Sequence, residues 1–509
     1  MTETVVADHP TIAAAPDDRP APSAWRTRFD RTLWLWPALL TLGFGLRGIG
    51  RPTLWRDELA SWSAASRSTG ELLDMLKNVD AVSGAYYLLL HFWIGLLGDS
   101  PTVLRLPAAL AMAGSAVLVV FIGRRLFDRW TALIAGLLFA LVPSISLYSQ
   151  QVRGYAFVVL MVSAATLTLL RALERPTWWR WAGYALCVTG AGLFHLISVV
   201  FLLPHAIVLV LRWRRSGERR VIRRFPVAVA LGLLPLVPLA VLGRQQVGRQ
   251  ISWIVTPDMQ SFPALWSGLF FSPLVAGIVL AMSVLPLAWS TDRRRAVETG
   301  MIAALPIAAI YLISQGSTSY FLDRYVLFTV PAWCVLSAAA ITALRPRVVM
   351  AVVFVVGTAL LGITDQRGLR GVGSHESVDD KGAAAIVAQG YRPGDAIVPD
   401  RGSKSFMMLD LAMRYYLPRQ VEPVDIFAAR SEVRNDDLYA VECGDPAACI
   451  GDVQRVWVVT YSDADGKDPY ANLPAREVAA LKAVFEPVEV QQVRQLTVAL
   501  LERKDAQGG

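Results

Sequence analysis

Long apolar runs separated by short arginine-rich segments fill the chain from residue 31 to residue 364. Runs such as PAALAMAGSAVLVVFIG and VVMAVVFVVGTALLGI carry no charge, and a helix needs about 20 mostly apolar residues to cross a bilayer. The pattern predicts a membrane α-helical protein with about eleven spans. The expected spans are 32–48, 103–122, 130–148, 155–171, 179–196, 197–212, 226–242, 266–290, 297–315, 321–344 and 347–364.

The region 49–102, after the first span, is predicted to be an outer loop. Its segment YYLLLHFWIGLLG, at 86–98, is too short and too aromatic for a span, and is typical of a helix lying in the membrane interface. If it did span, the later arginine-rich segments would all lie outside, so the charge pattern favours the interfacial helix.

Both ends of the chain differ in composition from the apolar region. Residues 1–30 are rich in Pro, Asp and Ala, which predicts a disordered cytoplasmic tail. From 365 to 509 the charge rises and period-2 apolar stretches appear at 395–400, 455–462 and 488–503, between helical patterns. These features predict a small extracytoplasmic α/β domain.

Two cysteines of this domain, Cys443 and Cys449, bracket the turn-rich sequence GDPAA. Neither a histidine nor a further cysteine lies near them in the sequence. Outside the cytoplasm, this spacing favours a small disulfide over a metal site.

The charge balance agrees with a membrane protein. The 49 Lys and Arg exceed the 41 Asp and Glu, and hydrophobic residues make up 54% of the chain against 18% charged residues. Most basic residues lie between apolar runs, where cytoplasmic retention explains them better than nucleic-acid binding does. The distribution places the N-terminus in the cytoplasm and, with eleven spans, the C-terminal domain outside a cell membrane. A soluble enzyme, a disordered chain and a coiled coil are excluded.

The first candidate chemistry is an acidic pair in TLWRDELASWS, at the start of the outer loop. Asp57 and Glu58 stand between Trp55 and Trp62. A carboxylate shielded by aromatic rings can have a raised pKa and act as a general base. The alternative is an ordinary helix start, where acidic residues complement the helix dipole.

Three arginines fall at the same predicted outer level: Arg105, Arg153 and Arg324. Arginine suits a phosphate because its planar fork makes two charge-assisted hydrogen bonds. Each arginine alone is better explained by snorkelling at a helix end. Together with the acidic pair and with Tyr155 and Tyr325, they predict a lipid-phosphate site.

Two histidines flank the hairpin at 196. His195 is a candidate because intramembrane ionisable residues are often functional, and His205 is a weaker one because a histidine can also satisfy a buried neighbour. The sequence has no HExxH, P-loop, CxxC or helix-opening GxGxxG motif.

Five motifs in a fixed order resemble the GT-C glycosyltransferase superfamily: LWRDELAS, YYLLLHFW, VLRLPAALA, SQQVRGY and FLDRY, within 30–345. The chain is most similar to bacterial relatives of protein O-mannosyltransferase and of the aminoarabinose transferase that acts on lipid A. The resemblance implies a polyprenyl-phosphate sugar donor and inverting transfer at the outer membrane face.

By motif match, the resemblance makes Asp57 the base that takes the acceptor proton, with Glu58 beside it. Arg153, Arg324 and Tyr325 become candidates to hold the donor phosphate, whose leaving charge needs stabilisation. Mannose is the expected sugar, and the acceptor is an envelope glycolipid, polysaccharide or protein. No cofactor is expected with certainty, and whether the site binds a divalent cation stays an open question.

The chain departs from the family pattern at two places. Relatives often have His-Pro-Pro-Leu where Val82–Ala85 stand, and Glu where Gln151 stands. The departures leave open an altered substrate, or a scaffold that binds lipid-linked sugars without transfer. A transporter is also an alternative, but the sequence shows no repeated halves.

Overall fold

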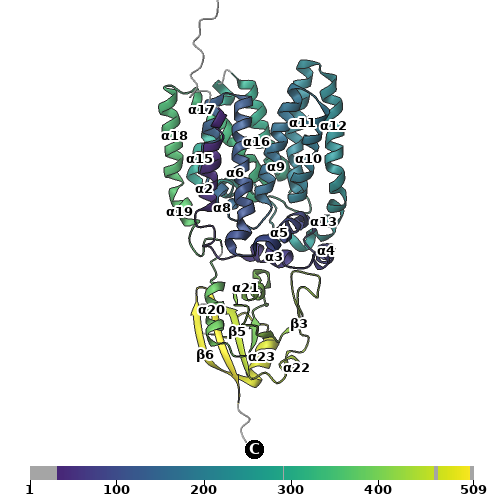
Figure 1. The fold of residues 1–509 in the computed structure, drawn as a ribbon, viewed down its shortest axis with the longest axis vertical. Coiled ribbons are helices and arrows are strands. Elements are labelled where there is room, and N and C mark those ends of the chain that lie inside the picture. The colour runs from purple at the N-terminus through teal and green to yellow at the C-terminus, as the bar shows by residue number, and fades with distance from the viewer. Residues whose placement is uncertain (1–30, 290–291, 376, 463–467, 505–509) are drawn as a thin grey trace, which may run out of the picture.

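The computed structural model describes residues 31–289, 292–375, 377–462 and 468–504. It consists of a helical bundle and a smaller domain containing a β-sheet at one end of that bundle, with the helices α3, α4 and α5 between them (Figure 1). This arrangement places the segment predicted as an outer loop in contact with the sequence-distant C-terminal residues.

Helices occur in all eleven of the predicted spans. Among the described residues, six helices are long and apolar enough to cross a membrane, and eight if each of two bent pairs is one span. The helices α2 and α18, with 12 and 15 residues, are shorter than a typical span. The fold is therefore that of a multi-pass membrane protein, but the count of eleven spans is not confirmed. The bundle helices are α2 (Leu35–Leu46), α6 (Pro101–Leu126), α7 (Arg129–Leu141), α8 (Pro143–Ser149), α9 (Tyr155–Glu174), α10 (Trp178–Phe194), η2 (Leu196–Phe201), α11 (Leu202–Ser216), α12 (Arg219–Leu233), η3 (Leu234–Leu236), α13 (Val237–Gln250), α14 (Ser261–Phe270), α15 (Pro273–Trp289), α16 (Arg293–Ile313), η4 (Asp323–Thr329), α17 (Val330–Ala343), α18 (Arg347–Leu361) and α19 (Ile363–Gly368).

Two proline residues mark the bends in the bundle. Pro143 begins α8 where the chain turns by 63° from α7, and Pro273 begins α15 after a 98° turn from α14. Proline lacks the N–H that a continuous helix requires, so it interrupts the helix at these points. The first bend directs α8 into the loop 150–154, which carries Arg153.

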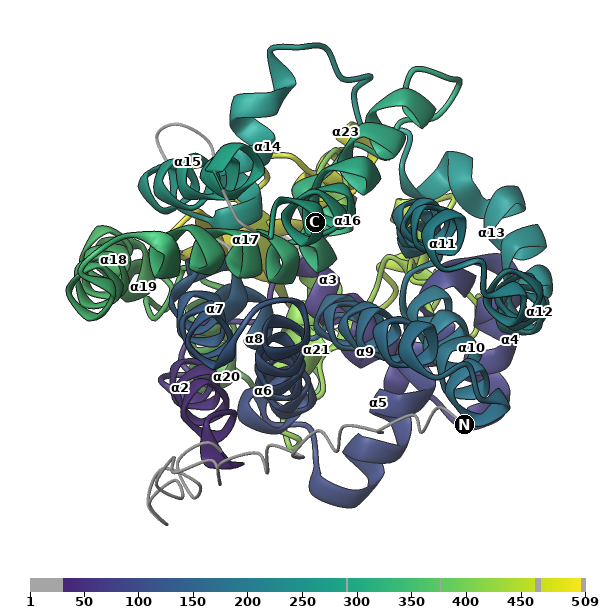
Figure 2. The ribbon, with the colours of Figure 1, turned by 90° about the horizontal axis from the view of Figure 1, so that it is seen from above.

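The segment between the first two bundle helices forms α3 (Arg56–Ala65), α4 (Thr69–Asn78), η1 (Ala81–Ser83) and α5 (Gly84–Leu97). Seen along the bundle, α5 runs across its end (Figure 2). Its side chains Phe92, Leu96 and Leu97 are exposed, as suits a helix at a membrane interface.

The C-terminal residues form a five-stranded mixed sheet in the order β2-β1-β5-β7-β6. β1 pairs in parallel with β2 and β5, and the other two pairs are antiparallel. β5 is buried on both faces because its sequence, RVWVVTY, is almost continuously apolar. The elements are α20 (Asp380–Gly390), β1 (Ala396–Pro399), η5 (Ser405–Met407), α21 (Leu409–Tyr416), β2 (Val424–Asp425), β3 (Ala428–Arg430), β4 (Val441–Glu442), α22 (Pro446–Cys449), β5 (Arg455–Tyr461), α23 (Ala475–Val484), β6 (Phe485–Val493) and β7 (Leu496–Arg503).

The C-terminal domain and the α3–α5 segment share one apolar cluster. Leu59 and Leu72 belong to it, together with Leu411 and Met413 of α21. Continuous packing of this kind fixes the domain against the end of the bundle where the candidate site lies.

Candidate active site

Glu58 forms a buried ion pair at the start of α3. Its carboxylate binds Arg105 of α6 through two hydrogen bonds, Nε to Oε1 at 2.9 Å and Nη2 to Oε2 at 2.6 Å, and both side chains are 0% exposed. Burial alone would raise the pKa of Glu58. The charge and hydrogen bonds of Arg105 have a larger, opposite effect, so the pKa falls to about 2. Glu58 is therefore an ionised structural group.

Every N–H of the Arg105 guanidinium has a partner. Beyond Glu58, it donates to the carbonyl oxygens of Ile49 and Pro52 through Nη1, at 2.8 and 2.9 Å, and to that of Thr53 through Nη2, at 3.1 Å. No donor remains for a ligand. The expectation that Arg105 binds a phosphate is thus corrected, since the structure makes it the clamp of the chain at 49–58.

Glu58 also connects α3 to the loop that carries Arg153. The backbone N–H of Val152 donates to Glu58 Oε1 at 2.9 Å. The ion pair therefore positions two candidate residues, Asp57 on one side and Arg153 on the other, although Glu58 itself faces away from solvent.

Asp57 has different surroundings. It is half-buried, and within the described residues its carboxylate takes part in no hydrogen bond or ion pair. Arg153 and Arg324 both lie within electrostatic range of it. A carboxylate without a fixed partner, within electrostatic range of two arginines, can accept a proton from an incoming hydroxyl group.

Arg153 is held by residues of η1 and α5. Its Nη1 donates to the hydroxyl of Tyr87 at 3.3 Å and lies 4.0 Å from Asp80 Oδ2, and Tyr87 in turn donates to Asp80. Asp80 was not among the site residues predicted from the sequence. An acidic residue shortly before the Val82–Ala85 departure was the available signal, but sequence alone could not pair it with Arg153.

The other selected residues gather in an aromatic group. The ring of His195 lies 4.4 Å from that of Tyr325 and 5.7 Å from that of Tyr155. Arg324 lies over the rings of Trp253 and Tyr325, at 5.6 and 5.9 Å. The residues predicted from 153–155, 195 and 324–325 are thus brought together.

A cavity of about 570 Å³ opens beside this group. His195 and Tyr325 line it together with Val82, Arg244 and Ser317. Its position between η1, α13 and the segment after α16 leaves space for a ligand beside His195 and Tyr325.

His205 and the glutamines occupy structural positions. His205 is buried between Thr166 and Tyr184, at 3.2 and 3.1 Å. Gln150 donates to the Gly45 carbonyl at 2.8 Å and ties the loop to α2, while the Oε1 of Gln151 is buried without a hydrogen bond. Among the described residues, no group of three His, Cys, Asp or Glu is arranged to hold a metal ion.

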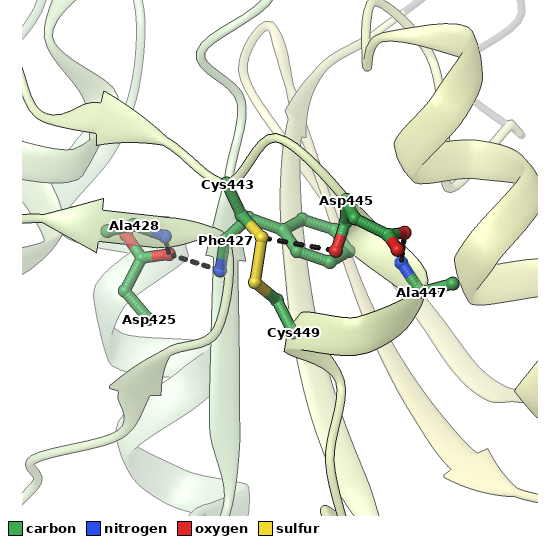
Figure 3. Close-up of a disulfide and its surroundings, with 7 residues drawn as sticks. All are labelled: Asp425, Phe427, Ala428, Cys443, Asp445, Ala447 and Cys449. Atoms are coloured by element: carbon green, nitrogen blue, oxygen red, sulfur yellow. Dashed lines mark hydrogen bonds between the residues drawn. A yellow bond between two sulfur atoms is a disulfide. The ribbon is translucent and has the colours of Figure 1, made fainter.

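Cys443 and Cys449 are joined by a disulfide, with their Cα atoms 6.7 Å apart (Figure 3). The bond closes the short turn between β4 and the end of α22. It lies in the sheet domain, where it links β4 to α22.

The bent helical bundle, the α3–α5 segment across its end and the C-terminal sheet domain define a fold of the GT-C type. A family model described as dolichyl-phosphate-mannose-protein mannosyltransferase matches residues 84–241. No curated protein sequence matches the chain.

ArnT from Cupriavidus metallidurans has a similar structure. Its apo form superposes with a TM-score of 0.62 at 15% sequence identity, covering 94% of this chain and 98% of that protein. Its form bound to undecaprenyl phosphate gives a TM-score of 0.61 at 15% identity, covering 96% and 100%. The resemblance to GT-C glycosyltransferases is confirmed by these matches, at the level of the fold.

Proposed function

We propose that the protein is an inverting membrane glycosyltransferase that moves a sugar from a polyprenyl-phosphate donor to an acceptor outside the cytoplasm. The observation that carries the proposal is that Asp57 lies within electrostatic range of both Arg153 and Arg324, close to the cavity-lining residues His195 and Tyr325 that these arginines also influence. A fold shared with a protein that binds undecaprenyl phosphate supports the choice of donor.

The proposed reaction follows from the charges at this site. Asp57 takes the proton of an acceptor hydroxyl, and the acceptor oxygen attacks the anomeric carbon as the bond from that carbon to the phosphate oxygen breaks. Arg153 and Arg324 stabilise the negative charge on the departing polyprenyl phosphate. Tyr155, Tyr325 and His195 form the wall against which the sugar lies.

The sugar proposed is mannose, which the matching family model names. The acceptor proposed is an envelope glycolipid, polysaccharide or protein. The protein would act in the cell membrane of a bacterium, with its N-terminus in the cytoplasm and the sheet domain outside.

The experiment measures transfer from radiolabelled polyprenyl-phosphate mannose to membrane acceptors by the purified protein in nanodiscs. Asp57→Asn should lower transfer by at least about a hundredfold, because the amide cannot accept the proton, while donor binding stays near that of the wild type. Asp74→Asn, an exposed change on α4 in the same segment, is the matched control. Equal transfer by the Asp57→Asn variant and the wild type would contradict the base assignment.

A second candidate is a scaffold that binds lipid-linked sugars without transferring them. Val82 lines the cavity where relatives often carry a different loop, and Gln151 replaces a glutamate. In the same assay, donor binding without transfer across a panel of sugars and acceptors would favour this candidate.

A further inference from the structure

A second large cavity lies at the opposite end of the bundle. It has a volume of about 660 Å³ and is lined by the ends of α6, α9 and α11 and by the start of α16. These helix ends lie at the end of the bundle away from the sheet domain, whereas α3, which carries Asp57, lies next to that domain (Figure 1).

The cavity is built around one buried carboxylate. Glu298 of α16 is 3% exposed and lies within ion-pair distance of three guanidinium groups. Arg212 Nη2 is 2.6 Å from it, Arg294 Nε 3.3 Å and Arg215 Nη1 3.5 Å. One carboxylate offsets one positive charge, so this group keeps a positive excess.

The positive excess faces the cavity. The side chains of Arg212, Arg215 and Arg294 are 24%, 45% and 53% exposed, and each has further N–H groups beyond its bond to Glu298. Counted over its described lining, the cavity has five arginines against three carboxylates. An anion whose oxygens accept two hydrogen bonds from a guanidinium group would satisfy these donors.

The described lining also has six uncharged residues, of which four are aliphatic. These four are Leu126, Leu170, Leu173 and Val221. A cavity lined by both arginines and leucines matches the two parts of a phospholipid, a charged head group and an acyl chain. A free phosphate would not contact the leucine side chains.

We propose that this cavity binds the phosphate head group of an anionic membrane phospholipid. The head group sits among Arg212, Arg215 and Arg294, where Glu298 keeps the guanidinium groups in place. Helix ends lie at the level of lipid head groups, and basic pockets between spanning helices attract anionic lipids there. This inference is independent of the proposed glycosyl transfer.

The test titrates the full-length protein in neutral detergent with dioleoyl phosphatidylglycerol and counts bound lipids by native mass spectrometry. Arg215→Gln/Arg294→Gln should weaken phosphatidylglycerol binding by about tenfold, because it removes two charge-assisted contacts. The matched control, Arg219→Gln/Arg220→Gln, removes the same charge from exposed positions of α12 outside the cavity and should bind like the wild type. Arg125→Gln, also in the lining, is a second variant if the double variant does not fold.

Three results would overturn the proposal. If phosphatidylglycerol binding weakens equally in the cavity and control variants, the lipid is attracted by the overall positive charge of this end of the bundle and not by the cavity. Displacement of phosphatidylglycerol by inorganic phosphate at similar concentration would show a site for the free ion. Equal affinity of the wild type for phosphatidylcholine and phosphatidylglycerol would show that the charge of the head group has no role.

Discussion

The neighbouring carboxylates of Asp57 and Glu58 lie in different electrostatic surroundings, although they are consecutive on α3. Successive residues of a helix point about 100° apart, so one can face the interior while the next faces the site. Glu58 binds Arg105 and the Val152 N–H, whereas Asp57 lies within electrostatic range of Arg153 and Arg324. One acidic pair therefore supplies a structural anchor and a candidate base.

Glu58→Gln should lower the free energy of unfolding by about 3–5 kcal/mol, because it leaves the Arg105 charge buried without its carboxylate. The measurement is thermal unfolding of the purified protein in detergent near pH 7. Asp74→Asn, which breaks the exposed Lys77–Asp74 pair, should change the stability by less than about 1 kcal/mol. Equal effects of the two changes would mean that the buried pair contributes no more than a surface pair.

Sequence alone could select the acidic pair and the arginines, because outer arginines near apolar runs are unusual. It could not assign their roles. Arg105 and Glu58 are 47 positions apart, and only the hydrogen bonds between them in the folded chain show that each satisfies the other. Asp80 was missed for the same reason, since its contact with Arg153 depends on the path of the chain between α4 and α5.

At the scale of elements, the loop 150–154 is held close to the end of α10. A side chain added at Gly154 would place its Cβ 2.8 Å from the carbonyl oxygen of Phe194. That oxygen belongs to the backbone and cannot rotate away, so glycine allows the approach that brings Arg153 near His195.

Gly154→Ala should therefore shift the loop, lower the stability by about 1–3 kcal/mol and reduce glycosyl transfer by at least about tenfold. The matched control is Gly183→Ala, within α10, where the nearest atom, on Thr168, is 3.9 Å away. Transfer assays and thermal unfolding on both variants make the comparison. A Gly154→Ala variant with normal transfer would show that the close approach is not needed.

α23 of the sheet domain carries a buried carboxyl group, Glu477, whose pKa is raised. Burial raises the pKa of Glu477 to about 7, and the nearby Glu442 adds to the shift while Arg401 opposes it. A raised carboxyl pKa means that the folded domain binds the proton more tightly than the unfolded chain. The ionised group therefore destabilises the domain as pH rises from about 4.5 through 7.

Glu477→Gln should stabilise the domain above pH 7 by up to about 3 kcal/mol and have little effect below pH 4.5, because glutamine resembles the neutral acid. Hydrogen exchange of the β5 and β7 amides in the full chain, measured from pH 5 to pH 8, reports the difference. A stability difference that is independent of pH would contradict the assignment.

The hydrophobic pattern of the sequence predicted where the helices lie more accurately than where they begin and end. The span expected at 226–242 lies within α12, η3 and α13, which together run over Arg219–Gln250. The extra turns are polar, so a hydropathy pattern could not include them. The sharp bends before Pro143 and Pro273 depend on local backbone geometry and were not predicted.

At the scale of the whole molecule, one segment of the sheet domain reaches the bundle. Asp437 binds Arg249 of α13 at 2.8 Å, and its carbonyl accepts a hydrogen bond from the buried Arg67. Asn78 of α4 donates to the neighbouring Asp436 carbonyl at 3.2 Å. The segment 431–439 therefore joins three parts of the chain near the candidate site.

Arg249→Gln should loosen this segment with little change in overall stability, because the pair is partly exposed and contributes about 1 kcal/mol or less. Amide exchange within 431–439 should become up to about fivefold faster. Arg430→Gln, an exposed arginine of the same domain, is the control. Unchanged exchange in the Arg249→Gln variant would show that the other contacts hold the segment alone.

The Arg67–Asp437 hydrogen bond joins positions 370 residues apart. At about 5–20 residues per second, a ribosome needs roughly 20 to 70 seconds to proceed from one to the other. During that time the nascent chain carries Asp57 without Tyr439, which lies within electrostatic range of Asp57. The surroundings of the candidate base thus include a residue synthesised long after it, and a chain whose synthesis stops before residue 439 lacks that residue.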